Sequence, residues 1–195
     1  MRERSLRTLP VILMMALVYL ASSAGFAQDT KKITDSAGRS VEVPNRISRV
    51  MAAGPPASIL LYTLAPEKMI GWVRKPTPAE KAFLKESVRE LPEYGRLTGR
   101  GGTANLENVL SFKPDLIIDI GTVGPTYVSL ANNVQEQTKI PYVLLDGTFT
   151  KTPQMYLLLG ELLDVKDRAE QLARYADETL HGLQTRIAAI PERSE

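Results

Sequence analysis

The chain has 195 residues, 44% of them hydrophobic, with a single histidine, a single tryptophan and no cysteine. This length suffices for one globular domain with its own core, or for part of a larger protein. The lack of cysteine excludes disulfides, thiolate metal sites, a cysteine nucleophile and a lipid-modified N-terminal cysteine.

The first 27 residues are typical of a secretory signal peptide. Basic residues precede an apolar run, Leu9–Leu20, and small residues follow it up to Ala27. The run is shorter than the roughly 20 apolar residues of a spanning helix, so we predict cleavage after Ala27 and export to the periplasm. Residues 1–27 hold three of the 24 basic and one of the 22 acidic residues, which leaves 21 of each sign. A nucleic-acid partner is therefore not expected.

Strand-like and helix-like segments alternate along the rest of the chain. The patterns predict, in chain order, a hairpin over 31–43 that turns at Gly38, a strand over 47–53, a helix over 57–64, a strand over 68–73, a helix over 79–88 that Pro78 starts, a helix over 106–112 that Asn105 caps, a strand over 115–120, a helix over 127–137, a strand over 142–145 and a helix over 152–163. The strand over 115–120 is apolar on both faces except at Asp119, which is typical of a parallel sheet covered by helices. We predict an α/β fold, a Rossmann-like open parallel sheet flanked by helices.

A long helix is predicted over 165–189. Its apolar residues form a single stripe at positions 169, 172, 173, 176, 180, 183, 187 and 190. Such a helix would be roughly 37 Å long, and little chain follows it to pack against. We therefore divide the chain into residues 1–27, the signal peptide; residues 28–164, an N-terminal α/β ligand-binding lobe; and residues 165–195, a linking helix.

Motifs for common enzyme chemistries are missing. The first strand is followed by AAGPPAS instead of G-x-G-x-x-G, and neither a Walker motif nor G-x-S-x-G occurs. The one histidine, His181, lies beside the stripe of the long helix, where nothing suggests a triad. We predict no catalytic residues, no cofactor and no protein-ligated metal, while a metal chelated by a small molecule stays open.

Several loops are expected at the carboxyl edge of the sheet, where open α/β folds bind ligands. Arginine and aromatic side chains in these loops suit a large, partly anionic and partly planar ligand. These residues are Trp72, Arg74, Lys75, Arg100, Tyr127 and Phe149.

The order of motifs resembles that of a known family. ITDSAGRSVEVP is followed by RVMAAGPPASILLYTLAPEKMIGWV, then GRLTGRGGTANLENVLSFKPDLIID, KIPYVLLDG and LLGELLDVKDRAEQLARYADETL. This series resembles the N-terminal lobe of the substrate-binding proteins of iron–siderophore, haem and cobalamin ABC importers, the class III periplasmic binding proteins. The resemblance implies two Rossmann-like lobes that are joined by one long helix and hold ligand between them. On this resemblance, the chain would correspond to the N-terminal lobe and the linking helix, without the second lobe.

The resemblance also assigns roles to individual positions. Glu107, in the N-L-E motif, matches a rim glutamate that docks onto arginines of the membrane permease. Ligand-contacting loops of the family are matched by Pro55, Pro56, Arg74, Lys75, Arg100, Gly101, Thr122 and Tyr127. These positions do not fix the substrate.

The expected function is that of an exported binding protein and not of an enzyme. It would capture a metal chelate, such as a ferric siderophore, and deliver it to an ABC permease in the inner membrane. Arg74 and Arg100 would pair with acidic groups of the chelate. Three alternatives stay open: haem or cobalamin as the ligand, a secreted α/β enzyme domain, and a truncated remnant that binds nothing.

Overall fold

A parallel sheet of three strands forms the centre of the fold. The computed structural model describes residues 29–98 and 105–190, so the predicted signal peptide lies outside the described residues. The strand order is β3-β4-β5, with β3 at Val50–Ala52, β4 at Leu116–Gly121 and β5 at Tyr142–Asp146. Both pairings are parallel, and the register places Val50 opposite Leu116 and Ile117 opposite Tyr142. The α/β class with a parallel sheet is thus confirmed.

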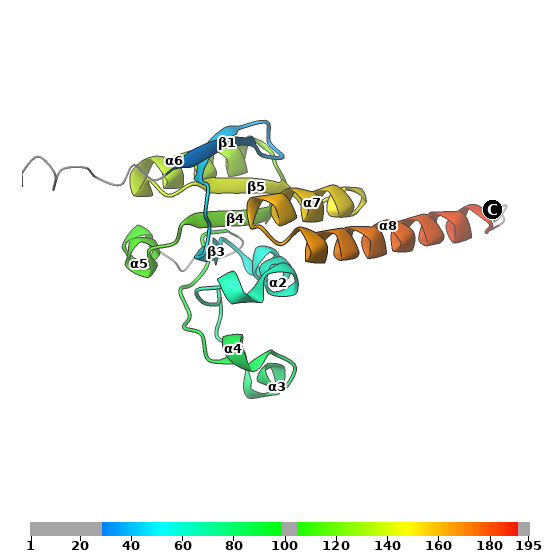
Figure 1. Cartoon of the computed structure of the whole chain (residues 1–195), viewed down its shortest axis with the longest axis horizontal. Coiled ribbons are helices and arrows are strands. Elements are labelled where there is room, and N and C mark those ends of the chain that lie inside the picture. The colour runs from blue at the N-terminus through cyan, green and yellow to red at the C-terminus, as the bar shows by residue number, and fades with distance from the viewer. Residues whose placement is uncertain (1–28, 99–104, 191–195) are drawn as a thin grey trace, which may run out of the picture.

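Helices surround the sheet, and some of them protrude beyond it (Figure 1). They are α2 (Pro55–Leu64), η1 (Pro66–Lys68), α3 (Pro78–Lys81), α4 (Glu86–Arg89), α5 (Leu106–Phe112), α6 (Pro125–Thr138), η2 (Phe149–Lys151), α7 (Thr152–Leu162) and α8 (Lys166–Ala188). Helix α2 packs on β3 and β4, α6 packs on β5, and α7 pairs with α8. The strands are almost wholly buried between these helices, which explains their continuous apolar sequences.

The predicted hairpin is confirmed and protects one edge of the sheet. Strands β1 (Thr30–Thr34) and β2 (Ser40–Pro44) pair antiparallel, and Gly38 supplies the turn with a φ of 76°. The Ser36 N–H donates to the carbonyl of Leu144 at 3.0 Å, and the Leu144 N–H donates to Asp35 at 3.2 Å. The hairpin tip therefore satisfies backbone hydrogen-bonding groups on the outer edge of β5, which would otherwise be free to pair with another chain.

The predicted strand over 68–73 is wrong. Only a single parallel bridge joins Met69 to Val50, after which the segment leaves the sheet. The Trp72 N–H donates to Pro92 at 2.8 Å, and the Tyr94 N–H donates to Trp72 at 3.0 Å. Because this backbone pairs with residues 92–94 instead of β3, the sheet has three parallel strands where four were predicted.

The predicted helix over 79–88 is also interrupted. It forms two single-turn helices, α3 and α4, which protrude below the sheet in Figure 1. At the break the Lys85 N–H donates to the Tyr62 hydroxyl at 3.2 Å, and within α4 the Val88 carbonyl accepts a bond from the Trp72 indole N–H at 2.8 Å. These tertiary contacts replace the helical continuation that local propensity favours.

Helix α8 is confirmed, but only its first half is covered. Ala169 and Ala173 are buried, whereas every residue from 181 to 190 is exposed, and the helix extends beyond the body of the molecule (Figure 1). The apolar stripe continues onto this uncovered part at Leu183, Ile187 and Ile190. Within residues 29–98 and 105–190, none of the helices combines the length and apolarity needed to cross a bilayer.

The contact between α7 and α8 depends on a glycine, which gives the first prediction. A Cβ at Gly160 would lie 2.1 Å from the Ala169 Cβ, so the two helices could not keep their present distance. Gly160→Ala is expected to lower the free energy of unfolding by about 1–3 kcal/mol, measured by urea denaturation. Gly182→Ala, in the exposed half of α8 with no atom within 4 Å, should instead raise it by up to about 1 kcal/mol. Equal effects of the two substitutions would contradict the packing argument.

Candidate functional site

The loops that leave the three strands meet at one edge of the sheet. The Ala53 carbonyl, just after β3, accepts the N–H groups of Leu97 at 2.7 Å and Thr98 at 3.1 Å. The Gly147 N–H donates to Gly121 at 2.9 Å, which joins the exits of β4 and β5. Leu97 and Thr98 therefore lie at the strand ends. The next predicted binding residues, Arg100 and Gly101, lie outside the described residues.

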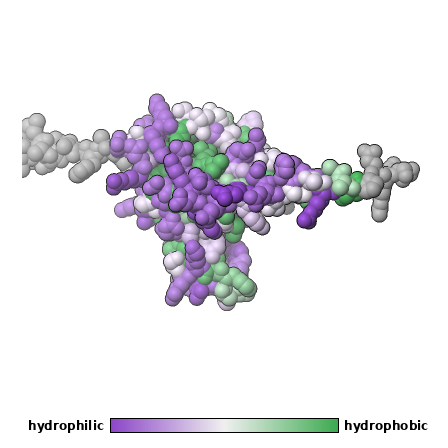
Figure 2. Space-filling view, turned by 45° about the vertical axis from the view of Figure 1, so that its right-hand side comes forward, coloured by the Kyte–Doolittle hydropathy of each residue, from purple (hydrophilic) through white to green (hydrophobic). Residues whose placement is uncertain are grey.

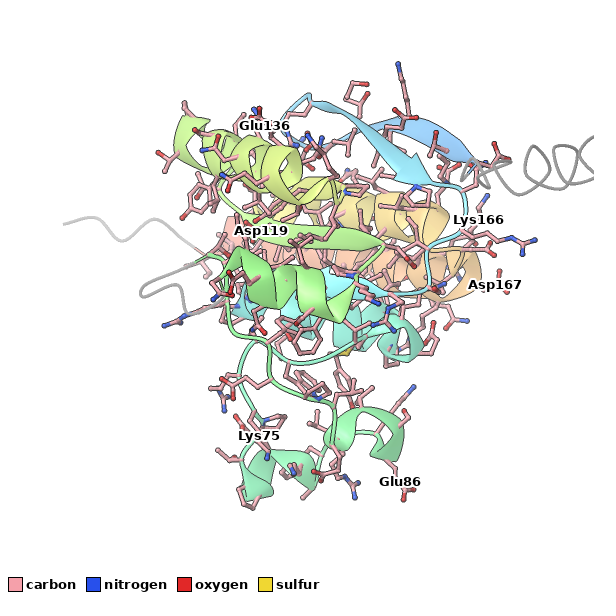
Figure 3. All side chains as sticks on the ribbon, turned by 90° about the vertical axis from the view of Figure 1, so that its left-hand side faces the viewer. Lys75, Glu86, Asp119, Glu136, Lys166 and Asp167 are labelled. Carbon is pink, nitrogen blue, oxygen red and sulfur yellow. The ribbon has the colours of Figure 1, made fainter. Side chains whose placement is uncertain are left out.

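A buried carboxylate connects these strand ends. Asp119, labelled in Figure 3, is 4% exposed. Its carboxylate accepts hydrogen bonds from the Thr98 hydroxyl and the Tyr142 hydroxyl, both at 3.1 Å. Burial raises the pKa of Asp119, although both hydrogen bonds oppose the shift. Burial also raises the pKa of Tyr142, and the nearby Asp119 carboxylate adds to that shift.

A cavity of about 610 Å³ lies beside the exit of β3, between α2, the loop after Gly71 and α3. This volume is within the range of small-molecule sites. Three of the predicted ligand residues contribute to it: Pro55, Trp72 and Arg74. The other lining residues are Ser58, Ile59, Val73, Pro76, Glu80, Phe83, Leu84, Glu93 and Arg96.

The walls of this cavity are mainly apolar. Trp72 is buried, its indole N–H is used by Val88, and its ring lies 5.9 Å from that of Tyr62. By contrast, Ile59 on α2 is 61% exposed and Phe83 after α3 is 87% exposed. Figure 2 shows hydrophobic surface on the protruding part of the molecule that carries α3 and α4.

The charged groups of the cavity are already engaged within the protein. The Arg74 guanidinium forms two hydrogen bonds with the Glu80 carboxylate, at 2.7 and 3.0 Å. These bonds, together with those from Thr77, lower the pKa of Glu80 to about 2. Glu93 accepts the Lys75 N–H at 3.1 Å. Two arginines and two glutamates line the cavity, so their formal charges cancel.

The remaining predicted residues lie near the same edge without lining this cavity. Pro56 is in the first turn of α2, and Lys75 is exposed on the loop that leads to α3 (Figure 3). Thr122 follows β4, Tyr127 is half-buried on α6, and Phe149 is 82% exposed after β5.

Glu107 is exposed in the first turn of α5, away from the cavity lining. Asn105 caps that helix through a 2.7 Å bond from the Asn108 N–H, as predicted. The helix therefore presents the Glu107 carboxylate to solvent on the surface of the lobe.

Sequence reasoning missed the wall that α3 supplies. Thr77 and Glu80 form a capping box, in which each side chain bonds the backbone of the other. The spacing T-x-x-E could have revealed this helix start and the position of Glu80. Ile59 and Phe83 carried no comparable signal, because an apolar residue in a helix is read as core.

Among the described residues, no three His, Asp or Glu side chains come together in a group that could hold a metal ion.

A second hollow of about 610 Å³ lies between the β1–β2 hairpin and α6, and its residues include Glu42, Lys139 and Pro141. It borders the start of β5 and not the strand exits.

Comparison with known proteins decides the family. The family model described as periplasmic binding protein matches residues 74–195, which is more than half of the chain. The chain belongs to the periplasmic binding protein family. The resemblance predicted from the sequence is thereby confirmed. No curated protein sequence matches the chain.

Solved structures of this family share the fold. An ABC transporter solute binding protein from Sulfurospirillum deleyianum matches with a TM-score of 0.73 and 28% identity over 83% of this chain and 51% of its own. The Haemophilus influenzae molybdate-binding protein MolA has a TM-score of 0.62 and 18% identity over 83% of this chain and 55% of its own. Staphylococcus aureus SirA, solved with staphyloferrin B, has a TM-score of 0.56 and 23% identity over 80% and 50%. The chain thus spans about half the length of these proteins.

Asp119 gives a prediction about pH. Because its folded pKa is raised above the ordinary 3.8, its contribution to stability is present below pH 3.8 and is lost as pH rises through the raised value. The free energy of unfolding of Asp119→Asn, measured with urea, should therefore rise relative to that of the unmodified chain over that pH range. Above the range, the difference between the two should stay constant. Asp177→Asn, an equal charge change on the exposed part of α8, is the control. A pH-independent difference between Asp119→Asn and the unmodified chain would contradict the shift.

Ser58 gives a prediction about stability. It is 2% exposed, and its hydroxyl has no hydrogen-bond partner among the described residues. Because an unsatisfied buried hydroxyl is costly, Ser58→Ala should raise the free energy of unfolding by about 1 kcal/mol or more. Ser129→Ala, on the exposed face of α6, should gain only about 0.5 kcal/mol from helix propensity. Thermal denaturation of both variants checks this, and a destabilised Ser58→Ala would show that the hydroxyl has a partner.

Proposed function

We propose that this chain is the ligand-binding lobe of the solute-binding component of an ABC importer, which captures a metal chelate in the periplasm. Its residues 1–27 would direct export, residues 28–164 would form the lobe, and residues 165–195 would form the linking helix. The observation that carries the proposal is a cavity of small-molecule size beside the exit of β3 in a periplasmic binding protein fold.

The ligand is best assigned to the class of metal chelates. With one histidine and no cysteine, the chain offers few groups for binding a bare transition metal, so the small molecule would supply the metal ligands. A ferric siderophore is the first candidate. SirA, a structural neighbour, was solved with such a chelate, staphyloferrin B. Haem is the second candidate, since a haem-binding protein is also among the neighbours, and cobalamin is the third.

The binding residues would form two groups. Pro55, Trp72 and Arg74 would contact the ligand from the cavity, with Pro56 and Lys75 beside them. The second group would border the ligand from the other loops: Arg100, Gly101, Thr122, Tyr127 and Phe149.

Glu107 would serve a different partner. It is exposed at the start of α5, on a helix that its asparagine cap fixes in place. The permease would recognise this carboxylate through arginine side chains, because arginine binds carboxylates with two parallel hydrogen bonds.

An enzyme is the alternative from another class, and the arrangement of the carboxylates speaks against it. Asp115 accepts bonds from Ser48 and Arg49 at the start of β4, whereas Asp119 faces Thr98 and Tyr142 near its end. The two carboxylates therefore do not form an acid–base pair. A remnant that binds nothing is the other alternative, and only a binding experiment separates it from the proposal.

Trp72 provides the test, because it is the only tryptophan and lines the cavity. Its fluorescence should change saturably at micromolar concentrations of a ferric siderophore. The gallium complex, which has the same charge and little visible absorption, controls for absorption by the iron chelate, and haem and cobalamin are titrated in parallel. If only haem or only cobalamin quenches the fluorescence saturably, that compound replaces the ferric siderophore as the assigned ligand. If no chelate changes the fluorescence, the proposal is refuted.

A further inference from the structure

We propose that the cavity between α2 and α3 receives an uncharged aromatic group of the ligand, and that the Arg74–Glu80 pair holds the cavity wall instead of binding an anion. This inference rests on the proposed function for its source, since the aromatic group would belong to the imported chelate. The cavity itself can be tested with small aromatic probes alone.

Two uncovered apolar side chains face this cavity from different elements. Ile59 comes from α2 and Phe83 from the end of α3, and both line the cavity while remaining largely exposed. Together with the buried Trp72 they form three apolar sides. A planar ring placed among them would remove part of the Ile59 and Phe83 surfaces from water, and aromatic pairs gain further from edge-to-face or offset packing.

The charges in the cavity favour an uncharged occupant. Both terminal nitrogens of Arg74 are bound to Glu80, so an anion at Arg74 would have to break this bidentate pair or remain beside the Glu80 carboxylate. Glu93 and Arg96 add one charge of each sign to the lining, so the cavity carries no net positive charge that would attract an anion. An uncharged ring needs no such rearrangement.

The start of α2 does not offer an alternative anion site. Helix N-termini attract anions through free backbone N–H groups. Here Pro55 and Pro56 occupy the first two helical positions and have no N–H. The first free donor is one residue later, at Ala57, so a phosphate-like group would find little to bind.

The Arg74–Glu80 pair has a different task, which is to fix the wall that carries Phe83. Glu80 also accepts the Thr77 N–H at 2.7 Å and so anchors the first turn of α3. On the far side, the Tyr62 hydroxyl accepts the Lys85 N–H at 3.2 Å. The segment with Phe83 is thereby held at both ends, and the ring is positioned before the ligand arrives.

The first experiment compares benzamide and benzoate, which have similar shapes and differ in charge. Nuclear magnetic resonance of the whole chain follows the indole N–H signal of its only tryptophan, Trp72. Benzamide should shift this signal saturably, and benzoate should bind at least about fivefold more weakly. Phe83→Ala should weaken benzamide binding by about tenfold. Tyr175→Ala, which removes a 70% exposed aromatic residue on α8, should leave it unchanged.

The second experiment tests the charge argument with Glu80→Gln. Glutamine also suits the third helical position of a capping box, so α3 should stay folded while Arg74 loses its counter-charge. The variant should then bind benzoate at least as tightly as benzamide, which reverses the order in the unmodified chain.

The outcomes separate the two proposals. If benzamide binds as described and no metal chelate does, the cavity assignment stands and the proposed function fails. If a chelate binds equally well to the unmodified chain and to Phe83→Ala, or if benzoate binds the unmodified chain more tightly than benzamide, the inference is overturned while the importer function stands. A lack of any benzamide response would also overturn it.

Discussion

The buried carboxylate of Asp119 is the constraint on which the strand-exit edge depends. A charged group in a core is costly unless its hydrogen bonds are satisfied, and the two oxygens of Asp119 obtain these bonds from Thr98 and Tyr142. One partner, Thr98, also bonds the Ala53 carbonyl at the exit of β3, and the other belongs to β5. The carboxylate therefore fixes Thr98 and the strands β4 and β5 relative to each other. Gly54 lies in the same layer, where a Cβ would come within 2.5 Å of the Thr98 hydroxyl oxygen.

This rigid edge contrasts with the outer wall of the cavity. The segment with α3 and α4 lies outside the sheet and is held by the buried Val88 and by polar contacts to side chains of the body. Residues in such a position tolerate change better than core residues, because few packed neighbours depend on them. A fold of this kind can keep one framework for the strand exits and alter its ligand through the wall.

The sequence predicted what depends on local pattern. The strands β4 and β5 were recognisable from apolar runs, α5 from its asparagine cap, and α8 from its stripe. Asp119 was visible as the one polar residue of its strand, but its partners lie 21 and 23 residues away in the chain, and no local pattern specifies them. The segment 68–73 has the composition of a strand, yet its backbone pairs with residues 92–94. The lining of the cavity was predicted in part for the same reason: the candidates Pro55, Trp72 and Arg74 lie in it, whereas the position of Phe83 depends on tertiary contacts around α3.

The long helix shows how a regular sequence can serve two different environments. Its stripe runs without a break, but three of the four residues in the first half are alanines, whereas all four in the second half are leucine or isoleucine. Ala169 can approach Gly160 closely because glycine has no side chain and alanine has only a methyl group. Helices α7 and α8 therefore pack at short range. Leu183, Ile187 and Ile190 are too large for such an approach and lie where the described residues provide no neighbour. The change from small to large residues along one stripe therefore marks the point at which the helix leaves the lobe.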